Sequence, residues 1–370
     1  MSEGPDRLHY IDNLRWTLIM LVIAVHASVT YGPVGGWFYY DRAGTDLVSG
    51  VFFTWISTIS QTFFMGLMFF LAGYFSPPSL EKKGPGRFVA ERLRKLGIPT
   101  LIFILIIGPG IVYFLNWSNT SLMGYYGAYL LDPSRYESGP LWFAIAVMVL
   151  TLAYVALKGR LPNIRIKKYG DRELFALAMA MAFGSFTVRL FYPIGSSIWS
   201  MQIPFFFQYV VLFALGIMAR HNGWLEELPV RAGRIWNYLA IVLAVLALPV
   251  LMITGSAMDG AYPSFMGGPH WQSMALAMWE QTFCVAASVS ILKWYAGRMN
   301  RENKRTRFLS KNSFAVYVFH APVLIAISLM LVHLEVPIIL KFFVVVIATV
   351  LVTYGFCDLL RRLPVFNGVL

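Results

Sequence analysis

The stretch LRWTLIMLVIAVHASVTYG, residues 14–32, decides how this chain folds and where its chemistry lies. Arg15 and His26 stand eleven positions apart in it, and nine of the ten residues between them are apolar. Eleven steps of an α-helix turn through about 1100°, which brings both side chains to one stripe roughly 16 Å apart. Ionisable residues in a membrane helix are costly and usually have a task. The structural alternative is that Arg15 snorkels to lipid headgroups while His26 hydrogen-bonds to a neighbouring helix.

The composition indicates a membrane protein. Of the 370 residues, 58% are hydrophobic and only 13% are charged, and the mean hydropathy is +0.64. We therefore predict an all-α, polytopic membrane protein with one transmembrane domain over residues 1–370 and a retained N-terminal anchor. About ten segments have the length and apolarity of a membrane span: 12–31, 48–75, 98–116, 139–157, 174–191, 202–219, 236–254, 271–292, 313–332 and 337–360.

The distribution of basic residues predicts the orientation. With both termini in the cytoplasm, 26 of the 30 Lys and Arg residues fall on the cytoplasmic side, as the positive-inside rule requires. The exceptions are Arg42, Arg135, Arg189 and Lys341. Short basic loops beside an anionic leaflet explain the net charge of +12 through orientation and lipid contact, without nucleic acid. The stretches 82–95 and 158–173 are also basic enough to attract a multiply phosphorylated cytosolic ligand.

Other patterns exclude several site classes. Cys284 and Cys357 lie in apolar runs, so we predict no disulfide framework and no thiolate metal site. The chain has no zinc-type His/Cys spacing and no Walker loop, so no metal is expected. The loops opposite the basic face, among them GPVGGWFYYDRAGTD (32–46), are rich in Trp, Tyr, Gly and Asp. Such residues form either an interfacial aromatic belt or a platform for a sugar.

Six motifs, taken in order, resemble the acyltransferase-3 family of integral membrane acyltransferases. Arg15 and His26 occupy the two ionisable positions of its first-helix signature, IDNLRWTLIMLVIAVHA (11–27). The resemblance runs from residue 7 to about 325, and it is closest to the glucan biosynthesis C-type members. The other motifs are FFLAGYF (69–75), RFVAERLRKLGIP (87–99), GPLWFA (139–144), FALGIMARHNGWLEEL (213–228) and LSKNSFAVYVFHAP (309–322).

The resemblance implies an O-acyltransferase of the bacterial inner membrane. Such an enzyme moves an acetyl or succinyl group from cytosolic acyl-coenzyme A to a hydroxyl of an extracytoplasmic carbohydrate. Arg15, Arg92, Arg94 and Lys95 would hold the phosphates of the donor, although Lys95 stands where the family often has Arg and cannot make a planar bidentate contact. The donor's pantetheine arm is comparable in length to the rise from Arg15 to His26, so the thioester reaches His26 from the cytoplasm.

The predicted site residues have distinct roles. His26 would be the general base, since an imidazole with a reference pKa near 6.5 suits the deprotonation of a hydroxyl. Glu280, an acidic residue in the middle of a span, would orient its ring. Gly73 and His320 are assigned to the coenzyme, with close helix approach and an interhelical hydrogen bond as their structural alternatives. Trp142 and Tyr317 are assigned to the acceptor, and for Trp142 an interfacial position is the alternative.

A different class of function competes with the enzyme. Buried charges could line the path of a carrier or flippase for a saccharide or a lipid-linked glycan. Transport that needs no acyl-coenzyme A would favour the carrier, and acyl modification that is lost in His26→Ala would favour the enzyme. The sequence leaves open whether transfer is direct or passes through a covalent relay, and whether the protein forms a homo-oligomer.

Overall fold

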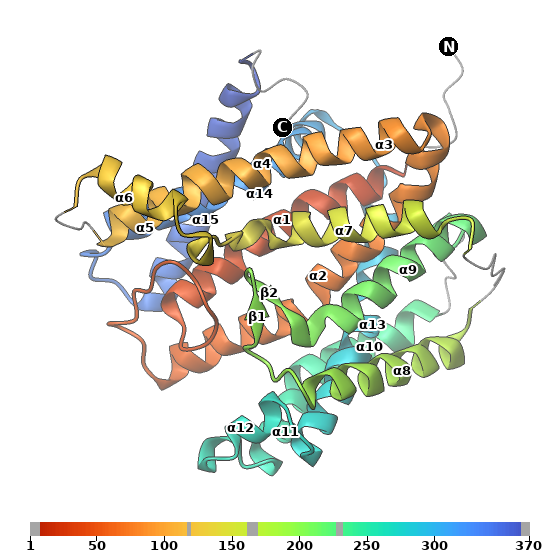
Figure 1. Cartoon of the computed structure of the whole chain (residues 1–370). Coiled ribbons are helices and arrows are strands. Elements are labelled where there is room, and N and C mark those ends of the chain that lie inside the picture. The colour runs from red at the N-terminus through yellow and green to blue at the C-terminus, as the bar shows by residue number, and fades with distance from the viewer. Residues whose placement is uncertain (1–7, 117–119, 161–168, 227–231, 364–370) are drawn as a thin grey trace. The chain divides into compact units, whose positions relative to one another are not determined.

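The computed structural model describes residues 8–116, 120–160, 169–226 and 232–363 (Figure 1). The chain forms two compact units. One comprises Met1–Leu14, Gln61–Phe88 and Val149–Arg301, and the other comprises Arg15–Ser60, Val89–Met148 and Glu302–Leu370. The prediction of cytoplasmic termini concerns residues 1–7 and 364–370, which lie outside the described residues.

The described chain is almost entirely helical, as predicted. Strands β1 (Ser197–Ile198) and β2 (Met201–Gln202) form a short antiparallel hairpin. The α-helices are α1 (His9–Tyr31), α2 (Leu47–Lys83), α3 (Pro85–Arg92), α4 (Ile98–Ile102), α5 (Gly108–Asn116), α6 (Leu122–Leu130), α7 (Trp142–Leu157), α8 (Asp171–Arg189), α9 (Phe206–Asn222), α10 (Ala232–Val242), α11 (Leu248–Thr254), α12 (Tyr262–Met266), α13 (Trp271–Arg298), α14 (Lys304–Met330) and α15 (Ile338–Leu360).

Within the described residues, nine helices are long and apolar enough to cross a membrane. Nine of the ten predicted spans correspond to them. The remaining segment, 174–191, is occupied by α8, which is helical but is not among the nine. Charged residues at both of its ends explain the difference: Asp171, Arg172 and Glu173 begin the helix and Arg189 ends it.

Prolines shape two of the long helices. Three π-helical turns occur in them, and each begins six residues before a proline. Proline lacks an N–H, and its ring collides with the carbonyl four residues earlier, so the helix widens locally instead of ending. The third span therefore runs over Pro85–Asn116, and its predicted start at residue 98 was wrong. The turns are η1 (Leu93–Gly97) before Pro99, η2 (Phe103–Ile107) before Pro109 and η6 (Leu243–Ala247) before Pro249.

The unit that contains residues 149–301 is built on α13. Helices α8 and α10 pack against α13, and the three lie together in Figure 1. Trp236 of α10 is buried in an apolar cluster with Ala178, Val285 and Ala286 and donates its indole N–H to Asp171 Oδ1 at 2.9 Å. Helices α2 and α9 meet at Gly73 and Gly216, where an added Cβ would overlap the backbone of the other helix. Both glycines are therefore required for close helix packing.

The unit that contains residues 302–370 is built on α14 and α15, which pack side by side. Phe53 of α2 packs against Phe342 of α15 with 5.5 Å between ring centroids and 59° between the ring planes. Helix α2 begins at Leu47 because Asp46 caps it: Asp46 Oδ1 accepts the backbone N–H of Ser49 at 2.8 Å. The hydrogen bonds from Ser49 hold the pKa of Asp46 below its ordinary value.

A buried ion pair joins α8 to α13. Arg189 Nη2 lies 2.5 Å from Glu280 Oε2, and both side chains are withdrawn from solvent. The remaining guanidinium nitrogens, Nε and Nη1, have no described partner, although the Phe205 ring lies 5.2 Å from the guanidinium carbon. An ion pair in such surroundings is expensive to break on one side, because the remaining charge stays buried.

This pair predicts an asymmetric response to substitution. Glu280→Leu should destabilise the purified protein by about 3–5 kcal/mol because it strands the Arg189 charge, whereas Glu280→Leu with Arg189→Met should recover much of that loss. The apparent melting temperature in detergent measures both. Equal melting temperatures for the single and double variants would contradict the pairing.

Candidate active site

His26 and His320 meet edge to edge. Nδ1 of His26 on α1 lies 2.9 Å from Nε2 of His320 on α14, and the two rings are nearly parallel, with an interplanar angle of 14°. His320 is fully buried. Two residues that are 294 positions apart in sequence therefore form one hydrogen-bonded pair within one unit of the structure.

The backbone of α14 fixes the direction of this hydrogen bond. The carbonyl oxygen of Tyr317 can only accept, so Nδ1 of His320, which faces it at 2.7 Å, carries a proton. In the neutral ring, Nε2 of His320 is then an acceptor, and Nδ1 of His26 must donate to it. Neutral His26 consequently keeps the lone pair on its own Nε2 for another partner.

An aromatic side chain covers one face of His26. The indole of Trp37, in the loop between α1 and α2, stacks on the imidazole with 3.9 Å between ring centroids and 14° between planes. Its Nε1 has no partner among the described residues. Trp37 was not singled out from the sequence. The signal that could have found it is the aromatic motif GGWFYYD (35–41), which follows the helix of the candidate base.

Tyr317 ties α14 to the segment before α7. Its hydroxyl donates to the carbonyl oxygen of Pro140, and its ring meets Phe143 edge-on at 6.2 Å. Tyr317 is buried, so this hydroxyl is occupied by the protein itself. Trp142, the other residue predicted to bind the acceptor, begins α7 and is half-buried.

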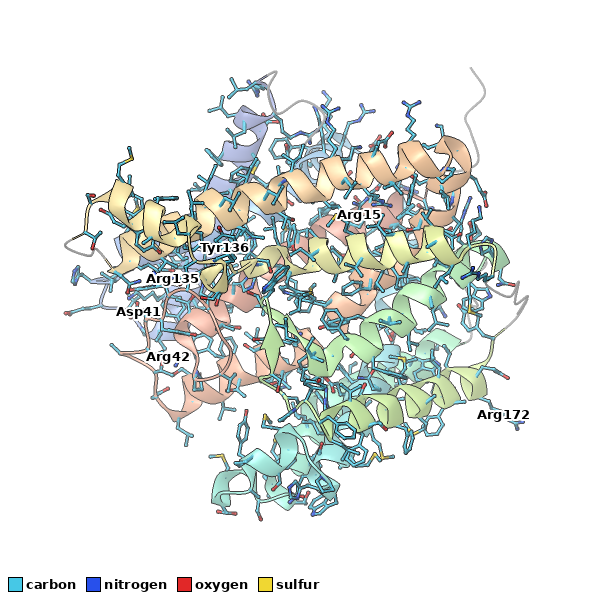
Figure 2. All side chains as sticks on the ribbon, in the orientation of Figure 1. Arg15, Asp41, Arg42, Arg135, Tyr136 and Arg172 are labelled. Atoms are coloured by element: carbon cyan, nitrogen blue, oxygen red, sulfur yellow. The ribbon has the colours of Figure 1, made fainter. Side chains whose placement is uncertain are left out.

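The predicted phosphate-binding residues also lie in the unit that holds His26. Arg15 is exposed on α1 (Figure 2), and its charge acts on that of Arg92, the last residue of α3. Arg94 and Lys95 are exposed in η1. Several basic side chains within one unit create a positive potential that attracts anions. The arrangement is suited to a phosphorylated ligand.

The structure gives Glu280 and Gly73 other partners than the sequence suggested. Oε2 of Glu280 pairs with Arg189, and Nδ1 of His26 faces Nε2 of His320, so the described hydrogen bond of the His26 ring is to His320 and not to Glu280. Sequence position gave the depth of Glu280 in its helix but not the side to which it points. Gly73 contributes the close helix packing described above.

A pocket of ≈ 360 Å³ lies in the unit that contains residues 149–301. Helices α2, α8, α9 and α13 line it, and its described lining is apolar apart from Tyr169, Glu173 and Ser288. It includes none of the predicted site residues in the described part of the chain. Among the described residues, no group of three His, Cys, Asp or Glu side chains is placed to hold a metal ion.

Comparison with known families identifies the family of the chain. The model of the acyltransferase domain family, acyltransferase 3, matches residues 8–359 and so covers both units. The chain belongs to the acyltransferase-3 family. It is an O-acyltransferase-type enzyme and, with its many apolar helices, a multi-pass membrane protein. The family resemblance predicted from the six motifs is confirmed.

The chain is similar to two curated proteins named glucans biosynthesis protein C. The protein of Escherichia coli strain K12 is 22% identical over 345 residues, which cover 87% of this chain and 83% of the relative. The protein of Shigella dysenteriae serotype 1 is 21% identical over the same length and coverage. The predicted likeness to C-type members is thereby confirmed. No solved structure matched the chain.

The histidine pair predicts a specific protonation pattern. In protein labelled with ¹⁵N-histidine, neutral His26 and His320 should both carry their proton on Nδ1, because the Tyr317 carbonyl sets the direction of the hydrogen bonds. The ¹⁵N chemical shifts in detergent report this pattern, and His26→Ala and His320→Ala assign the signals. A neutral His26 with its proton on Nε2 would contradict the arrangement.

Proposed function

We propose that this chain is a bacterial inner-membrane O-acyltransferase with His26 as general base. It transfers an acetyl or succinyl group from cytosolic acyl-coenzyme A to a hydroxyl of an extracytoplasmic carbohydrate. Residues 1–370 form one transmembrane domain whose termini lie in the cytoplasm, in agreement with the 26 basic residues assigned to that side. The relatives' name, glucans biosynthesis protein C, supports a glucan or another periplasmic glycan as acceptor.

The hydrogen-bond chain from Tyr317 through His320 to His26 is the observation that carries this proposal. A general base needs its second ring nitrogen held so that the first presents a lone pair in a fixed direction. His320 supplies that hold at 2.9 Å, and the Tyr317 carbonyl fixes the tautomer of His320. His320 is therefore the orienting residue in this proposal, in place of Glu280.

One direct transfer accounts for the chemistry with a single base. Nε2 of His26 takes the proton of the acceptor hydroxyl while the hydroxyl oxygen attacks the thioester carbonyl carbon. The carbon–sulfur bond then breaks, and the departing thiolate takes the proton back from Nε2 of His26. The ester forms, coenzyme A leaves as the thiol, and the imidazole returns to its neutral state.

The donor's phosphates bind at Arg15, Arg92, Arg94 and Lys95. Arg15 and His26 share the continuous helix α1, so the phosphate contact and the base are held roughly 16 Å apart along it. A pantetheine arm covers a distance of that order, and the thioester reaches the base without passage of the whole donor across the membrane. The exposure of Arg15, Arg94 and Lys95 supports their contact with a soluble ligand.

The acceptor approaches from the opposite end of α1. Trp142 is the residue we assign to stacking on its sugar ring, since an aromatic face is a suitable platform for a sugar. Tyr317 has a different role in this proposal. Its hydroxyl is bonded to the carbonyl of Pro140, so Tyr317 fixes the segment from which Trp142 projects.

The function is tested with radiolabelled acetyl- and succinyl-coenzyme A and a periplasmic glycan extract. Purified wild-type protein should transfer label to the glycan, and His26→Ala should lower the rate by about 10²–10⁴-fold, the usual contribution of a general base. His270→Ala, at an exposed histidine before α13, is the matched control and should retain activity. Equal transfer by wild type and His26→Ala would remove His26 from the mechanism.

The donor site is tested by neutralising one of its charges. Arg92→Gln should raise KM for the acyl-coenzyme A about tenfold or more with little change in kcat, because a hydrogen bond to a charged group contributes about 1.5–3 kcal/mol. Arg135→Gln, at an exposed arginine assigned to the outer side (Figure 2), should leave KM unchanged. An unchanged KM in Arg92→Gln would exclude Arg92 from the phosphate site.

A further inference from the structure

The loop between α1 and α2, residues 32–46, returns to the helix it has just left; we call it the strap. Its Trp37 stacks on His26, eleven residues earlier in the chain. Farther along, the backbone N–H of Asp41 donates to the carbonyl of Thr30 at 2.9 Å, and Thr45 Oγ1 donates to the carbonyl of Tyr31 at 2.7 Å. The strap is thus fastened to the last turn of α1.

An ion pair fastens the strap to a second helix. Lys341 Nζ on α15 lies 2.9 Å from Asp41 Oδ2, and the two side chains are only 8% and 10% exposed. The same Nζ donates to the carbonyl of Val332 at 3.0 Å. A buried pair with a further hydrogen bond resists separation, because either charge alone would remain desolvated. Asp41 and Lys341 therefore act as a latch.

The indole of Trp37 also contacts a second aromatic ring. Phe38 meets it edge-on at 5.3 Å, and Phe38 in turn packs on Phe103 with 6.3 Å between centroids. Gly139 adjoins the two phenylalanine rings at a positive φ of 48°, and a side chain there would collide with them. The indole therefore has little freedom to tilt.

We propose that the strap positions His26: Trp37 fixes the plane of the imidazole, and the Asp41–Lys341 latch fixes Trp37. This inference rests on the proposed function of His26 as the base. The hydrogen bond to His320 holds the ring at one edge and leaves it free to tilt about that edge. A flat partner on the ring face removes the tilt and so sets the direction of Nε2. Misplacement of a reacting group by about 1 Å costs about 10²-fold in rate.

Two substitutions at one position separate positioning from simple filling of space. Trp37→Phe keeps a flat face, and Trp37→Leu keeps apolar bulk without one. We expect Trp37→Leu to lower kcat by about 10–100-fold with KM for the acyl donor unchanged, and Trp37→Phe to stay within a few-fold of wild type. Equal kcat in the two variants, or a loss confined to KM, would overturn the proposal.

Chemical modification tests the strap independently of acyl transfer. Diethyl pyrocarbonate reacts with accessible imidazole nitrogens, and peptide mass spectrometry gives the rate at each histidine. Trp37→Leu should raise the rate at His26, while the exposed His270 serves as the internal control with an unchanged rate. If wild type has no transferase activity but Trp37→Leu still raises the modification rate at His26, the proposed function is refuted and the strap is retained. If wild type is active but Trp37→Leu leaves the rate at His26 unchanged, the strap is refuted.

The latch is tested by removing both charges together. Lys341→Met with Asp41→Asn leaves no stranded charge, so it isolates the loss of the contact from the cost of a buried ion. We expect it to lower kcat and raise the modification rate at His26 as Trp37→Leu does, and to add little in combination with Trp37→Leu. Fully additive losses in that cycle would show that the latch does not act through Trp37.

Discussion

The hydrogen bond between His26 and His320 is the contact on which the rest of the site depends. His320 is fully buried, so water cannot satisfy its ring and it must find partners within the protein, one of which is His26 on another helix. The direction of the bond is inherited from a backbone carbonyl, that of Tyr317, which cannot reverse its role as acceptor. A structural feature of α14 thus determines which nitrogen of His26 is available for chemistry. The position of α14 is in turn tied to the chain before α7 by the Tyr317 hydroxyl.

The basic residues discussed above fall into two groups, those with a partner inside the protein and those exposed on its surface. The basic residues assigned to the outer side are each matched within their own unit: the Arg42 guanidinium lies 4.1 Å from the Tyr40 ring, and Arg135 pairs with Asp132. Arg189 pairs with Glu280, and Lys341 pairs with Asp41. These four exceptions to the positive-inside pattern therefore serve structure. Arg15, Arg94 and Lys95, in contrast, are exposed, which agrees with the donor site proposed at the basic end of α1.

The sequence was sufficient to predict the helical architecture and to place Arg15 and His26 on one helix, because hydropathy and residue spacing along a helix depend only on local geometry. It does not determine which way a side chain points. The structure shows that Glu280 on α13 points to Arg189 on α8 and pairs with it, which the sequence did not indicate. The start of the third span was set too late because hydropathy rises only after the basic segment 87–95, whereas the helix is continuous through that segment and through Pro99, with a π-helical turn before the proline. Trp37 was missed because a loop's return path is not encoded in any period of its sequence.

A continuous helix is well suited to carry both ends of a reaction that joins two compartments. Between Arg15 and His26 the sequence contains neither proline nor glycine, so nothing in that segment of α1 favours a kink that would alter their separation. In the proposed function, the distance between the phosphate contact and the base is then set by the fold, and the donor's arm has to match it. The strap complements this rigidity at the other end, since it fixes the ring that the helix delivers. Helix α1 sets the position of His26 along the helix axis. The hydrogen bond to His320 sets the tautomer of His26, and in our proposal the stacking of Trp37 limits the tilt of its ring.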